Sequence, residues 1–159
     1  MSIKACSVAI AAAITIGALP ARADPITCDH LNAALVAGAS EHQLQTPTVK
    51  KELVSPGNPY SSAAWTISFE GQPLLILCHD GYVKTFAADS HELNSNEILV
   101  MDIALKAWGF EPEEAVKIRD MLITEAKKTH MAEVRARQGR ISFIISFADA
   151  PSFVIDANW

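Results

Sequence analysis

The sequence lacks the short motifs by which many small enzymes are identified. It contains no Gly-x-Ser-x-Gly segment, which excludes the nucleophile elbow of the α/β-hydrolases. It contains three cysteines but no Cys-x-x-Cys pair, which excludes a thioredoxin-like redox site. Its one long apolar run, residues 6–19, is about 14 residues long, shorter than the roughly 20 residues needed to cross a bilayer core.

This apolar run is typical of a cleavable secretory signal peptide. Lys4 precedes it, and an Ala-x-Ala segment ending at Ala23 provides the small residues that a signal peptidase requires before its cut. We therefore predict a signal peptide over residues 1–23 and a single domain over residues 24–159. The alanine-rich leader is typical of bacteria, so the expected location is periplasmic or secreted. An uncleaved membrane anchor is the alternative interpretation.

Basic residues are scarce, with 13 of them against 18 acidic residues. Removal of residues 1–23 takes away Lys4 and Arg22 but no acid, which leaves 11 against 18 and a formal charge of −7. A domain of this charge repels phosphate backbones. Nucleic acid is therefore not an expected partner.

Two cysteines remain after cleavage, Cys28 and Cys78. An even number of cysteines in an exported chain predicts a disulfide. Closing a loop of about 50 residues would stabilise the fold by about 4 kcal/mol on the chain-entropy account. A pair of free thiols, or a thiol site, is the alternative.

Hydrophobic patterns predict a sheet. Residues 64–70 alternate between apolar and polar, as in a strand with one buried face. Residues 74–78 are continuously apolar, which predicts a central strand covered on both faces. Asp80 and Gly81 then suit a tight hairpin turn. The expected strands are residues 48–54, 64–70, 74–78, 82–87, 140–147 and 152–156.

Helical spacing and capping signals predict three helices, over residues 27–38, 94–109 and from 112 toward 138. Asn94 and Glu97 match a capping box, and Pro112 suits a first helical position. The apolar stripe of the last helix fades after Ala126, but we expect the helix to continue. Because strands and helices occur in runs, the predicted fold class is α+β. The expected antiparallel sheet has about five strands, a three-stranded meander plus a C-terminal strand pair, with helices packed on one face.

Two sets of side chains could carry chemistry. The acid–base groups that a small hydrolase could use are His79, Asp80, His91 and Asp102. The residues whose types suit zinc are Cys28, His30, Cys78 and His79. Consecutive residues of a strand point to opposite faces, so the second set is not expected to converge on one ion. We therefore predict no metal and no cofactor, and the sequence assigns no catalytic residue.

Residues 127–140 carry the strongest local charge in the chain. Their basic residues outnumber their single acid by four, so the rest of the mature chain has a charge of −11. This polarity could attract an anionic partner or lipid headgroups, although cations also suit the end of a helix. The candidate partner-binding residues are Lys127, Lys128, Arg135, Arg137 and Arg140.

These observations favour a non-catalytic exported protein that binds an envelope protein or an anionic ligand. A small secreted hydrolase is one alternative, which requires at least two of its acid–base groups to meet at one point. A metal or redox protein that uses the two cysteines is the other.

Overall fold

The computed structural model describes residues 25–53, 62–136, 140–148 and 151–158. The predicted signal peptide and the turn-rich segment at residues 55–59 lie outside these ranges. The helices are α1 (Cys28–Glu41), α2 (Ser95–Ala107) and α3 (Pro112–Thr129). The strands are β1 (Thr48–Leu53), β2 (Ala63–Phe69), β3 (Gln72–His79), β4 (Tyr82–Asp89), β5 (Met131–Ala136), β6 (Ile141–Ser146) and β7 (Ser152–Ala157). The α+β class is confirmed.

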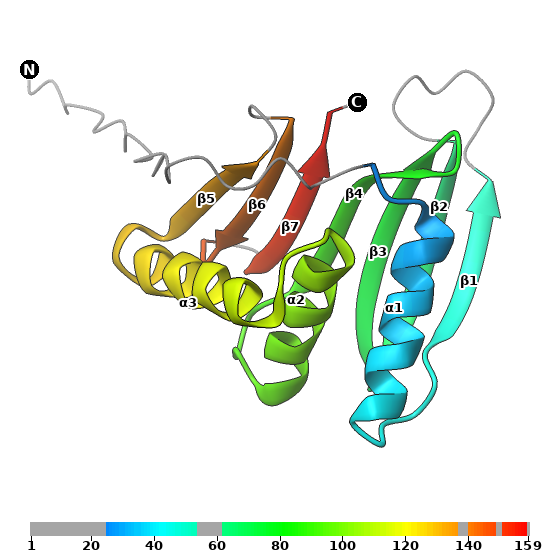
Figure 1. The fold of residues 1–159 in the computed structure, drawn as a ribbon, viewed down its shortest axis with the longest axis horizontal. Coiled ribbons are helices and arrows are strands. Elements are labelled where there is room, and N and C mark those ends of the chain that lie inside the picture. Colours follow the sequence, from blue (N-terminus) through cyan, green and yellow to red (C-terminus); the bar gives the residue numbers. More distant parts are fainter. Residues whose placement is uncertain (1–24, 54–61, 137–139, 149–150, 159) are drawn as a thin grey trace, which may run out of the picture.

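All seven strands belong to one antiparallel sheet with the order β1-β2-β3-β4-β7-β6-β5. Strands β1 to β4 form one meander and β5 to β7 a second, and the two meanders join where β4 pairs with β7. The three helices lie on the same face of this sheet (Figure 1). The prediction of about five strands was therefore too low.

The core lies between the helices and this sheet face. Every strand except β1 contributes alternate, buried apolar side chains to it. At the junction of the meanders, Phe86 and Phe153 meet edge to face, with ring centroids 6.3 Å apart. Trp108, at the end of α2, meets Phe143 of β6 in the same way. The helices are thus fixed to both meanders by one continuous core.

The prediction that the last helix continues toward Gln138 was wrong. Helix α3 ends at Thr129, where His130 adopts a left-handed conformation with φ of 67°. The following residues form β5, an edge strand that pairs only with β6. Every second side chain of β5 is buried and the others are exposed or half-buried, as expected for a strand with one face on the core. Two of its three buried residues are alanines, and because alanine is the best helix former, the strand period was hidden in the sequence.

The prediction that residues 74–78 are covered on both faces is not met by the described helices. Leu74, Ile76 and Cys78 are buried on the helical side. Leu75 and Leu77 lie on the opposite face, because successive strand residues point to opposite sides. No described helix covers that face (Figure 1).

Candidate functional site

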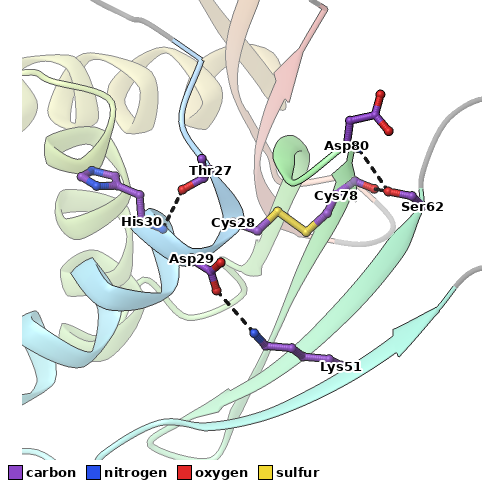
Figure 2. Close-up of a disulfide and its surroundings, with 8 residues drawn as sticks. All are labelled: Thr27, Cys28, Asp29, His30, Lys51, Ser62, Cys78 and Asp80. Atoms are coloured by element: carbon purple, nitrogen blue, oxygen red, sulfur yellow. Dashed lines mark hydrogen bonds and ion pairs between the residues drawn. A yellow bond between two sulfur atoms is a disulfide. The ribbon is translucent and has the colours of Figure 1, made fainter.

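The predicted disulfide is present. Cys28 and Cys78, both buried, join the start of α1 to the end of β3 (Figure 2). Thr27 forms the N-cap of α1, where its hydroxyl accepts the N–H of His30 at 3.1 Å. Since both sulfurs are in this bond, neither is a thiolate that could bind zinc or attack a substrate.

The residues just before α1 extend the sheet. Val83 donates its N–H to the carbonyl of Ile26, and Cys28 donates its N–H to the carbonyl of Gly81, each at 2.9 Å. Residues 26–28 therefore pair with the start of β4, beyond the point where β7 ends. The disulfide and these hydrogen bonds together fix the beginning of the predicted mature domain.

The four predicted acid–base groups are not brought together. His79 and Asp80 lie at the β3–β4 turn, where the His79 Nε2 is 3.7 Å from the Asp80 Oδ2 and both side chains are exposed. His91 follows the far end of β4, a strand of eight residues or about 26 Å. Asp102 lies in α2 and pairs with α3. Among the described residues, no three His, Cys, Asp or Glu side chains are placed to hold a metal ion.

Asp102 links the two C-terminal helices. Its Oδ2 accepts a hydrogen bond from the guanidinium of Arg119 on α3, which also donates to Asp120 at 2.8 Å. Burial raises the pKa of the Asp102 carboxyl, against the opposing effects of Arg119 and Lys106. The other oxygen, Oδ1, is buried without a hydrogen bond. This arrangement is an interhelical ion pair.

The five candidate partner-binding residues do not share one helix face. Lys127 and Lys128 lie in the last turn of α3, where Lys128 pairs with Glu125 at 3.3 Å. Arg135 lies on β5 and pairs with Glu133 at 2.8 Å. Arg140 is exposed at the β5–β6 turn, and Arg137 lies outside the described residues. The positive charge is divided because the chain turns back as a strand after His130.

The sheet face opposite the helices carries an apolar row. Leu75 of β3 is paired with Ala87 of β4, which is paired with Val154 of β7, which is paired with Ile144 of β6. These four side chains therefore lie side by side across the four central strands. They are half-buried by their sheet neighbours, except Leu75, which is 38% exposed. We call this face of the sheet the open face.

Charged and small polar residues surround the apolar row. In register with it, Lys50 of β1 lies at one end and Glu133 of β5 at the other. The next row along the strands begins with Glu52 and ends with Arg135. Between these ends, the rows beside the apolar row also contain Thr85, Asp156, several serines and the half-buried Leu77. The open face is thus apolar at its centre and charged at its two edge strands.

A shallow hollow of about 490 Å³ lies on the open face, between β3, β4 and the start of β7. Leu75, Ala87, Asp89 and His91 line it. The N–H of His91 donates to the Asp89 carboxylate at 2.9 Å. Small-molecule sites usually enclose most of their ligand, whereas this hollow is wide open. It is better suited to the surface of a macromolecule.

The sequence carries a signal for the open face. A strand with one solvated face has polar residues at every second position, but β3 has Leu75 and Leu77 at these positions and β6 has Ile144. The signal was missed because a continuous apolar run is equally typical of a strand covered by the same chain on both sides. No known protein family, curated protein or solved structure matches this chain.

Proposed function

We propose that this chain is a non-catalytic exported protein that binds a partner protein across the open face of its sheet. The observation that carries the proposal is the apolar row, because no described helix covers it. Uncovered apolar patches framed by polar residues commonly mark interaction surfaces. A flat strip across four strands offers area and shape to another folded surface rather than an enclosed site to a small molecule.

The proposed export rests on two features. The leader at residues 1–23 has the pattern of a signal peptide. The Cys28–Cys78 disulfide suits an oxidising compartment. The described residues contain no helix that is long and apolar enough to cross a membrane. The leader and the disulfide together lead us to propose the periplasm or secretion as the location.

The hydrolase alternative is not carried further, because His79 and Asp80 are both exposed at a turn, and His91 and Asp102 lie on other parts of the fold. Of the candidate partner-binding residues, Arg135 gains support, since it lies on the open face at the edge strand β5. The remaining cations stay a prediction for an anionic partner. Lys127 and Lys128 also suit the C-terminal end of the α3 dipole, which accounts for them without a ligand.

Photo-crosslinking in the cell that makes the protein tests this proposal. A photo-crosslinking amino acid is placed at Leu75, on the open face, or at Val116, on α3. The two side chains are matched, being 38% and 37% exposed. We expect an adduct of defined mass from position 75 and none from position 116. Failure to obtain an adduct at position 75, or equal adducts at both positions, would contradict the proposal.

A further inference from the structure

The sheet has a pseudo-symmetric arrangement about its middle strand. In the order β1-β2-β3-β4-β7-β6-β5, three strands lie on each side of β4. A two-fold axis parallel to β4 and lying just above the open face would place a second copy face to face with the first. It would put β1 over the partner's β5, β2 over its β6, and β3 over its β7.

The charges at the two edges of the open face run in opposite order. In the row of Leu75, the β1 end carries Lys50 and the β5 end carries Glu133. In the next row, the β1 end carries Glu52 and the β5 end carries Arg135. The two-fold axis would therefore bring each cation over an anion of the other copy at both edges.

The centre of the face is partly self-complementary under this operation. Leu75 of one copy would lie over Val154 of the other, and Ala87 would lie over its own counterpart on the axis. Ile144 would lie over Thr66, and in the next row Leu77 would lie over Asp156.

A two-fold axis across the strands, centred between the two rows, would also pair the edge charges. It would place Leu75 over Leu77, Val154 over Asp156 and Ile144 over Ser142. The charge swaps described below distinguish this arrangement from the one with the axis parallel to the strands.

We propose that the partner of the open face is a second copy of this chain, bound face to face about a two-fold axis parallel to the strands. This inference rests on the proposed function, whose binding surface it uses. Seven strands at sheet spacing and six residues of strand length span about 29 Å by about 20 Å, or about 600 Å² per copy. The total of about 1,200 Å² lies at the lower end of specific interfaces, which favours a dimer that dissociates on dilution.

A charge-swap experiment by sedimentation equilibrium tests the inference. The protein is expressed from its full sequence and purified as the cell processes it. Lys50→Glu with Glu52→Lys should weaken dimerisation about tenfold, because attraction at both edges becomes repulsion. Glu133→Arg with Arg135→Glu should do the same, and the four substitutions together should restore wild-type association. Each swapped pair keeps its own ion pair within the strand, so the melting temperature is the control for folding.

Asp89 provides an independent test, because it lies on β4 and would face its own counterpart near the axis. Asp89→Asn should strengthen association severalfold by removing this repulsion.

An axis across the strands would predict no effect of either charge swap, since the swapped charges would still face charges of opposite sign. A wild-type protein that stays monomeric up to millimolar concentration, or swaps that do not rescue each other, would overturn the dimer. A heterologous adduct at position 75 would then still support the proposed function.

Discussion

At the scale of single residues, Gly38 shows how closely the helices pack. It lies in α1 against Ile103 of α2, and an added Cβ would lie 2.7 Å from the Cγ1 of Ile103 and still closer to its Cδ1. Gly38→Ala should lower the free energy of unfolding by about 1 kcal/mol, because the overpacking penalty exceeds the gain in helix propensity. Urea denaturation measures the change.

The control for this prediction is the same substitution in an Ile103→Ala background. With the obstructing methyl groups removed, Gly38→Ala should raise the stability by about 1 kcal/mol, the ordinary helical advantage of alanine over glycine. An equal effect in both backgrounds would show that the two helices do not approach as closely as described.

Asp102 is a second residue with a specific consequence, in this case for pH. Burial raises the pKa of its carboxyl in the folded state above the unfolded value of about 3.9. Ionisation is thus harder in the folded protein, so the contribution of Asp102 to stability falls as pH rises from about 4 through the folded pKa. Asp102→Asn lacks this effect, and Arg119 keeps Asp120 as its partner.

We expect the stability of Asp102→Asn relative to wild type to increase with pH across that interval. Urea denaturation of both proteins at pH 4, 5.5 and 7 measures the difference. A difference that is constant or that decreases with pH would mean that Arg119 dominates the titration of Asp102.

At the scale of elements, the boundary between α3 and β5 depends on one backbone conformation. His130 has a positive φ of 67°, which costs an L-residue about 1–2 kcal/mol relative to glycine. His130→Gly should remove this strain but add freedom to the unfolded chain, for a net stabilisation of about 0.5 kcal/mol. The shift in the urea midpoint measures it.

His42 is the matched control for this substitution. It ends α1 just as His130 ends α3, but its φ is −95°. His42→Gly should therefore lower the stability by about 0.5 kcal/mol, since only the unfolded-state effect remains. Stability changes of the same sign for the two substitutions would contradict the left-handed conformation at the end of α3.

At the scale of the whole molecule, the two meanders should unfold as one unit. Trp65 lies in the first meander and Trp108 packs on the second, and both belong to one continuous hydrophobic core. Each can be made the sole tryptophan by changing the other and Trp159 to phenylalanine. For each variant, we expect the fluorescence and far-UV circular dichroism midpoints in urea to coincide at low protein concentration. Two separated transitions would show that the β4–β7 junction does not couple the meanders.

Most features that the sequence predicted correctly are local ones. The capping box at Asn94, the start of α3 at Pro112 and the hairpin at Gly81 depend on residues a few positions apart. The Cys28–Cys78 bond was predictable because only two cysteines remain in the expected mature chain. The separation of the acid–base groups was not predictable. It depends on the order and direction of the strands in the sheet, which bring residues from distant parts of the chain together or hold them apart.

The sequence by itself determined the α+β class and most strand and helix positions, because hydrophobic period and caps act within the local chain. It also determined the disulfide, because two cysteines allow only one pairing. Only the tertiary structure decided that residues 131–136 form an edge strand, that β4 joins β7, and that the apolar row lies on a face that no described helix covers. Strand order sets these features, because it brings together residues far apart in the chain. The same order aligns the edge charges of β1 and β5 in common rows, on which the proposed dimer depends.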